Sequence, residues 1–210
     1  MYAKSSGNGI TTDQSDAIVA NTANRLTNTN LITALEARIV ALEVLLPAAI
    51  GNLRAGGVVF WVDPSDNTHG LVCALSDYAT TVAWGCSSSD SPSVPNVTWN
   101  SGNPVGAGAE IGDGESNTTG ILTDCSTAPA ALAARSYGAE WFLPSIKELN
   151  EMYRNKATLE AVSGFTAFSS YYWSSTEYDN NDAWRQYVDS GNQGLNYKYG
   201  TDNVRAVRAF

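Results

Sequence analysis

An apolar repeat near the N-terminus divides this chain into two kinds of structure. Residues 31–50 read LITALEARIVALEVLLPAAI, with apolar residues alternately three and four positions apart. This is the a/d spacing of a coiled coil, and it predicts a helix with one apolar seam. Pro47 and Gly51 are expected to end the helix, because proline cannot continue it. The seam consists of Ile32, Leu35, Ile39, Leu42 and Leu46.

Two interpretations of this helix remain open. In the seam register Arg38 takes a g position and Glu43 the following e position, which is where parallel chains pair opposite charges. Two heptads are too short to be stable alone, so one amphipathic helix packed on the next domain is the alternative. We favour a parallel homo-oligomer, a dimer or a trimer, formed by a coiled-coil helix over residues 31–50.

Residues 1–30 are expected to form a polar N-terminal segment. Thr11 and Gln14 have the spacing of a capping box and indicate a short helix. The opening MYAKSSGNGITT has no apolar run of the signal-peptide kind, and no window approaches the roughly 20 apolar residues of a membrane span. The chain therefore carries no recognisable signal peptide and is not expected to insert in a membrane.

From about Gly56 the pattern changes to short strands and turns. GGVVFWVD predicts a strand, and HGLVCALS is its expected hairpin partner. Ser145 and Glu148 form a capping box that opens a helix in EWFLPSIKELNEMY, and further strands are expected in AFSSYYWSS, AWRQYVD, GLNYKYG and NVRAVRAF. Residues 87–127 are expected to be a long loop. This order predicts an α+β fold with an antiparallel sheet.

Charge and residue types argue against several functional classes. The net charge is −9 and the basic residues are scattered, so nucleic acid and anionic membranes are poor partners. His69 lies in a turn and has no evident nucleophile, so we do not expect an enzyme. Three cysteines without a CxxC pair, beside a single histidine, argue against a tetrahedral zinc site. Cys73 is expected in the core, whereas Cys86 and Cys125 are either a disulfide or two loop thiols.

The stretch DAWRQYVDSG alternates two kinds of side chain. On an extended strand Trp184, Gln186 and Val188 point to one side, because successive side chains alternate between the faces of a sheet. Arg185, Tyr187 and Asp189 then point to the other side. The first set suits burial and the second suits a binding surface.

Several of these stretches together resemble one family. GGVVFWVD, HGLV, AWGC, EWFLPSIKELNEMY, YYWSSTEY, AWRQYV and VRAVRAF are similar to a bacterial and phage domain found at the C-terminus of a collagen-like adhesin of Legionella. The similarity runs from about Gly56 to the C-terminus. It implies a C-type lectin-like fold over residues 54–210, with a ligand face built from the C-terminal strands and loops.

The same fold carries the variable proteins of diversity-generating retroelements, in which randomised Asn codons yield Asn, Asp, Tyr, Ser, Gly, Arg or Leu. The resemblance implies framework residues at Trp184, Gln186, Val188, Lys198, Val204 and Val207. The positions between them hold that residue set, and tyrosine and small polar residues are also what antibody loops use. The expected ligand-binding residues are Asp179, Asn181, Arg185, Tyr187, Asp189, Ser190, Leu195, Asn196, Tyr197, Tyr199, Asp202 and Asn203.

We therefore predict a ligand-binding protein that recognises a cell-surface protein or glycan, located outside the cell, on its surface or on a phage virion. Two alternatives stay open: an adhesin of fixed glycan specificity, and a structural fibre tip. Residues 179–182 supply oxygen atoms of the kind calcium prefers. The Glu-Pro-Asn type of motif of animal lectins is absent, so a calcium cofactor is not supported.

Overall fold

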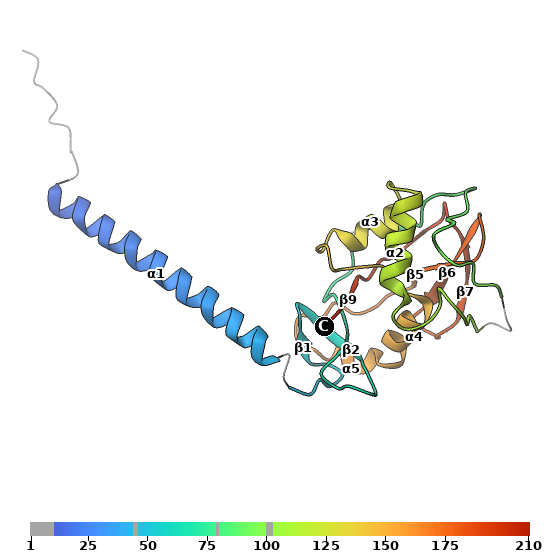
Figure 1. Cartoon of the computed structure of the whole chain (residues 1–210), viewed down its shortest axis with the longest axis horizontal. Helices are drawn as coiled ribbons and strands as arrows, with labels where there is room; N and C mark the ends of the chain where they lie inside the picture. Colours follow the sequence, from blue (N-terminus) through green and yellow to red (C-terminus); the bar gives the residue numbers. More distant parts are fainter. Residues whose placement is uncertain (1–10, 44–45, 79, 100–102) are drawn as a thin grey trace, which may run out of the picture. The chain divides into compact units, whose positions relative to one another are not determined.

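The computed structural model describes residues 11–43, 46–78, 80–99 and 103–210, apart from the side chains of residues 40, 41 and 43. The chain divides into two compact units between Leu45 and Leu46 (Figure 1). The first unit holds one helix, and the second holds every strand and the remaining described helices. The structure is thus of mixed helix and sheet, α+β, with an N-terminal helix.

Helix α1 (Thr12–Glu43) is longer than the sequence suggested. The capping box is confirmed: the amide of Thr11 donates to Gln14 Oε1 (2.9 Å) and the amide of Gln14 donates to Thr11 Oγ1 (3.3 Å). The helix passes through residue 30 without a break, because its 32 residues include no glycine or proline. The helix thus includes parts of both the polar segment expected over residues 1–30 and the coiled-coil helix expected over residues 31–50. Leu46, the last seam residue, lies in a bend beyond the helix.

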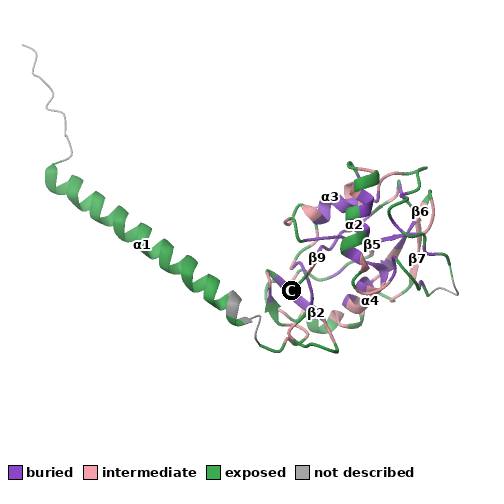
Figure 2. Ribbon diagram, viewed as in Figure 1, coloured by how far each residue is buried: buried purple, intermediate pink, exposed green. Residues whose placement is uncertain are grey.

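The side chains of α1 are exposed all round wherever they are described (Figure 2). The seam residues Ile32, Leu35 and Leu42 are 57%, 58% and 60% exposed. The side chain of Glu43, expected at an e position, lies outside the described residues. Covering such an apolar stripe would be favourable, because apolar surface exposed to water costs free energy.

The first sheet of the second unit has the order β1 (Leu53–Arg54), β2 (Gly57–Val62), β3 (Gly70–Cys73) and β9 (Val207–Ala209). All of its pairs are antiparallel. The hairpin predicted from GGVVFWVD and HGLVCALS is confirmed as β2 and β3. Because β9 pairs with β3, the end of the chain closes the sheet begun near residue 53.

A second sheet carries the C-terminal polar and aromatic residues. It has the order β5 (Tyr171–Glu177), β6 (Asp182–Tyr187) and β7 (Gln193–Tyr197), again antiparallel. Strands β4 (Val82–Ala83) and β8 (Thr201–Asp202) form a separate, two-stranded antiparallel sheet. The four C-terminal stretches expected to form strands each contain one.

The described residues of the second unit include four helices: α2 (Asp113–Asp124), α3 (Pro129–Arg135), α4 (Ile146–Arg154) and α5 (Lys156–Glu160). The predicted capping box of α4 is confirmed. The expectation of a continuous loop over 87–127 was wrong, because α2 lies within it. Its sequence DGESNTTGILTD is poor in strong helix formers. Buried Asn117 and Thr118 anchor it instead, through hydrogen bonds to Gly108 and Leu143.

The cysteines resolve the alternative left open by the sequence. Cys86 and Cys125 form a disulfide with their Cα atoms 6.1 Å apart, which ties β4 to the end of α2. Cys73 is free and fully buried. Burial raises the pKa of the Cys73 thiol to about 12, so it stays protonated and unreactive.

Glu148 couples the start of α4 to α2 inside the core. Its carboxylate accepts hydrogen bonds from the amides of Ser145 and Gly112, both at 2.8 Å, and its side chain is fully buried. Burial raises the pKa of Glu148 to about 7, although these hydrogen bonds act in the opposite direction.

This raised pKa predicts that the fold loses stability as the pH rises from about 4.5 to 7. In that range the unfolded chain releases the Glu148 proton while the folded chain retains it, so the free energy of unfolding falls with pH. The expected fall is on the order of 3 kcal/mol from this group. Chemical denaturation of the wild type and of Glu148→Gln across this range checks it. An identical pH slope in both proteins would contradict it.

Candidate binding face

Strand β6 shows the alternation that its sequence predicted. Trp184, Gln186 and Val188 are 0%, 0% and 1% exposed, so these three side chains are packed in the core. Arg185 and Tyr187 are partly exposed and Asp189 is exposed. The indole of Trp184 donates to the carbonyl of Val97 at 2.8 Å, which satisfies its polar atom inside the core.

The outward side of β6 forms a cluster with Tyr171 of β5. The Arg185 guanidinium lies 3.9 Å from the centre of the Tyr171 ring. The Tyr187 ring stacks on the same ring with centroids 4.6 Å apart. Sequence reasoning missed Tyr171, although it is directly opposite Tyr187 in the β5–β6 register. A two-strand register model built from the sequence would have found it.

The buried Asp202 and the partly exposed Asn196 complete this cluster. Arg185 Nη1 lies 3.3 and 3.4 Å from the two carboxylate oxygens of Asp202, and Asn196 donates to that carboxylate at 3.0 Å. Asp202 is only 6% exposed. Burial raises its pKa, and the Asn196 hydrogen bond and the Arg185 charge oppose the rise. Asp202, expected as a ligand-binding residue, is thus nearly buried and holds Arg185 in position.

We call Tyr171, Arg185, Tyr187, Asn196 and Asp202 the Arg185 cluster. Its aromatic and charged groups hold one another in place, since the guanidinium contacts a ring on one side and a carboxylate on another. Cation–π contact and a charge-assisted hydrogen bond both favour this geometry. The guanidinium therefore stands preorganised, with 24% of the Arg185 side chain still exposed.

The β6–β7 register separates other expected binding residues from this cluster. Trp184 is opposite Leu195, and Asp182 is opposite Tyr197. Directly opposed residues point to the same side of a sheet. Leu195 and Tyr197 therefore lie on the Trp184 side and not on the Arg185 side, and the single shared face expected from sequence was wrong. In this register each odd-numbered residue of β6 is paired with an even-numbered residue of β7, and the side chains of such a pair point to the same side of the sheet.

Exposed aromatic rings mark the Trp184 side. Tyr197 and Tyr199 stack on each other with ring centroids 5.1 Å apart, and they are 54% and 67% exposed. Trp99 stacks on Trp184 at 5.2 Å and is 50% exposed. We call Tyr197 and Tyr199 the tyrosine pair.

The remaining expected site residues shape the turns around the second sheet. Asp179 accepts from the amides of Asn181 (2.7 Å) and Asp182 (2.9 Å) in the β5–β6 turn. Ser190 accepts from the amide of Asn192 at 3.3 Å in the β6–β7 turn. Asn203 donates to the carbonyls of Ser169 and Tyr171 at 2.9 and 3.0 Å. Asn203 thus supports the strand end that presents the Tyr171 ring.

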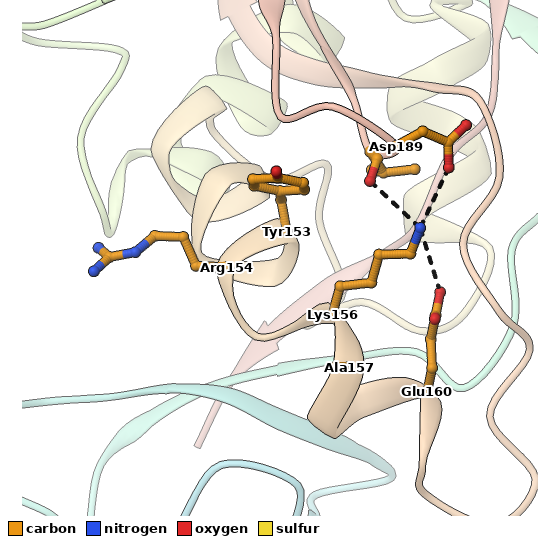
Figure 3. Close-up of a pocket in the computed structure, with 7 residues that line it drawn as sticks. Tyr153, Arg154, Lys156, Ala157, Glu160 and Asp189 are labelled. Carbon is orange, nitrogen blue, oxygen red and sulfur yellow. Dashed lines mark hydrogen bonds and ion pairs between the residues drawn. The ribbon is translucent and has the colours of Figure 1, made fainter.

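A surface pocket of about 460 Å³ adjoins the Arg185 cluster at Asp189. The Lys156 ammonium lies between Asp189 (3.3 Å) and Glu160 (3.9 Å), as Figure 3 shows. A hydrogen bond to Asp189 raises the pKa of the Tyr187 hydroxyl. Asp189 therefore links the pocket to the cluster. Sequence reasoning missed this pocket because α4, α5 and the end of β6 meet only in the fold. Its lining is Tyr153, Arg154, Lys156, Ala157, Glu160, Val188 and Asp189.

The described residues contain neither a candidate metal-binding group nor a candidate membrane-spanning helix. In residues 11–43, 46–78, 80–99 and 103–210, no group of three or more His, Cys, Asp or Glu side chains is placed to hold a metal ion. Over the same residues, no helix has the length and apolarity that crossing a membrane requires.

Comparison with known proteins gives a family and a distant structural neighbour. No curated protein matches the sequence. The solved structure of a fimbrial protein from Bacteroides ovatus has 17% identity and a TM-score of 0.46, over 73% of this chain. This chain covers 44% of that protein. The family model described as the Lcl C-terminal domain matches residues 74–208, so the chain belongs to the Lcl C-terminal domain family.

Proposed function

We propose that this protein is a non-enzymatic, adhesin-like binding protein that recognises a cell-surface protein or glycan from outside the cell. Membership of the Lcl C-terminal domain family supports this role. The observation that carries the proposal is the Arg185 cluster, a set of partly exposed polar and aromatic groups fixed by buried partners. Groups already held in position lose little conformational entropy when a ligand binds.

The proposed head is a C-type lectin-like domain, and the proposed stem is a parallel coiled coil of α1. The exposed seam of α1 supports the stem, because a second or third copy would cover it. Several heads on one stem would raise the apparent affinity for a surface without any new contact. A presentation on a cell surface or a phage virion fits such an assembly.

The test compares the Arg185 cluster with the tyrosine pair. Arg185→Ala with Tyr187→Ala is expected to reduce binding at least about tenfold, because each removes a contact group from the face. The melting temperature should also fall, because Arg185→Ala takes the ion-pair partner from the nearly buried Asp202, so binding is measured at a temperature where the variant remains folded. Binding of the full chain to a printed glycan array and to intact cells supplies the readout.

Tyr197→Ala with Tyr199→Ala is the matched control, because it removes two exposed rings from the other side of the sheet. If this control abolished binding while the Arg185 and Tyr187 variant retained it, the proposed face would be wrong. If neither variant changed binding, the recognition site would lie elsewhere on the head.

A second candidate is the same head diversified by a retroelement. The residue types at positions 185, 187, 197 and 199 favour it, because randomised Asn codons produce them and buried framework residues separate them. A near-copy of the final 40 or so codons beside a reverse-transcriptase gene, differing only at adenines, would support it. A gene neighbourhood without such a copy would leave an adhesin of fixed specificity.

A further inference from the structure

Arg25 is an isolated charge in the middle of α1. It is the sole charged residue between positions 17 and 35, and its side chain is exposed. The nearest acidic residues in the sequence are Asp16 and Glu36, nine and eleven positions away. At 1.5 Å per residue these carboxylates lie about 13 and 16 Å along the helix axis. No ion pair of Arg25 occurs in the part of the chain that the structure describes.

The seam register continues from Ile32 toward the N-terminus, because α1 is one unbroken helix. Counting back in heptads places Arg25 and Ile18 at a positions and Asn28 and Asn21 at d positions. Asn21, Arg25 and Asn28 therefore occupy three consecutive seam layers. Ile18 precedes them and Ile32 follows them in the seam. This register is not visible in the apolar spacing alone, which is why the sequence suggested a seam of only two heptads.

A parallel oligomer in this register brings identical residues to the same level. The Arg25 guanidinium groups of all copies would then converge at one seam layer, with Asn28 on one side and Asn21 on the other. Like charges this close repel, and the repulsion is stronger where neighbouring helices exclude water. An in-register copy brings its own Asp16 and Glu36 no nearer, so no carboxylate of the stem can neutralise the layer.

We propose that the α1 stem binds a small inorganic anion, of the chloride class, at the Arg25 layer. The inference rests on the oligomeric stem of the proposed function, because one chain alone does not form the site. Guanidinium and amide nitrogens are hydrogen-bond donors, and arginine has no acceptor, so the layer suits an anion that accepts from several directions. The residues between Arg25 and the two asparagine layers add no competing charge.

The experiment measures oligomer assembly of the full chain by sedimentation equilibrium, in sodium chloride mixed with sodium gluconate at constant ionic strength. Gluconate is too large and hydrated to replace chloride in a helix core. If each oligomer takes up one anion, a tenfold rise in chloride should raise the association constant about tenfold once chloride exceeds its dissociation constant. Constant ionic strength removes general screening from the comparison.

Two variants assign the effect to the layer. Arg25→Ile should assemble at least as tightly as the wild type and show no chloride dependence, because an apolar a residue needs no counterion. Arg38→Gln removes one positive charge at a g position of the same helix, so it should keep the chloride dependence. If chloride acted on the head and not on the stem, the wild type, Arg25→Ile and Arg38→Gln would all show the same chloride dependence of assembly.

The outcomes separate this inference from the proposed function. A chain that stays monomeric at every chloride concentration, with Arg25→Ile also monomeric, would overturn both the stem and its anion site. An oligomer whose association constant does not change with chloride concentration would overturn the anion site alone. It would mean that the Arg25 side chains extend out of the seam into water. A chloride dependence that survives in Arg25→Ile would also overturn it.

Discussion

Replacing Lys198 by methionine is expected to lower the free energy of unfolding by about 3–5 kcal/mol, because it leaves a buried carboxylate without its partner. Lys198 and Glu177 form an ion pair, and both side chains are completely buried. The ammonium also lies 4.8 Å from the centre of the Trp84 ring. Burial raises the pKa of Glu177, and the Lys198 charge opposes that rise. Without Lys198, Glu177 must either stay charged in the core or take up a proton.

Denaturant unfolding of the head at pH 7 measures this loss. Lys156→Met is the matched control, since Lys156 also pairs with a carboxylate but keeps 26% of its side chain exposed. It should cost no more than about 1 kcal/mol. The double variant Glu177→Leu with Lys198→Met should recover most of the stability, because it removes both buried charges. A single Lys198→Met variant as stable as Lys156→Met would contradict the argument.

Lys198 also shows which parts of the framework could be recognised from the sequence. Lys198 was expected in the framework through family resemblance, although charged residues are rarely buried. The capping boxes at Thr11 and Ser145, and the alternation along β6, were predicted from local spacing alone. Such features depend on residues within a few positions of one another, so the sequence carries them directly.

The features that the sequence could not supply depend on contacts between distant segments. The β6–β7 register decides whether Tyr197 shares a side with Arg185, and one residue of offset moves a side chain to the opposite face. The burial of Asp202 follows from the pairing of β8 with β4, residues more than a hundred positions away in the chain. Helix α2 forms because of buried side-chain hydrogen bonds and not because of its helix propensity.

Removing the Cys86–Cys125 disulfide is expected to lower the free energy of unfolding by about 4 kcal/mol. The bond joins residues 39 positions apart, and a cross-link over such a loop mainly reduces the entropy of the unfolded chain. The closed loop includes α2, whose residue types favour a helix only weakly. The double variant Cys86→Ser with Cys125→Ser should therefore melt well below the wild type, by more than about 8 °C.

Reduction of the wild type with dithiothreitol supplies the control, because it should reproduce the loss seen in the double variant and leave that variant unchanged. Cys73 does not complicate the comparison, since its buried thiol stays protonated and cannot exchange with the disulfide. An unchanged melting temperature in the double variant would show that Asn117 and Thr118 already hold the loop in the unlinked chain.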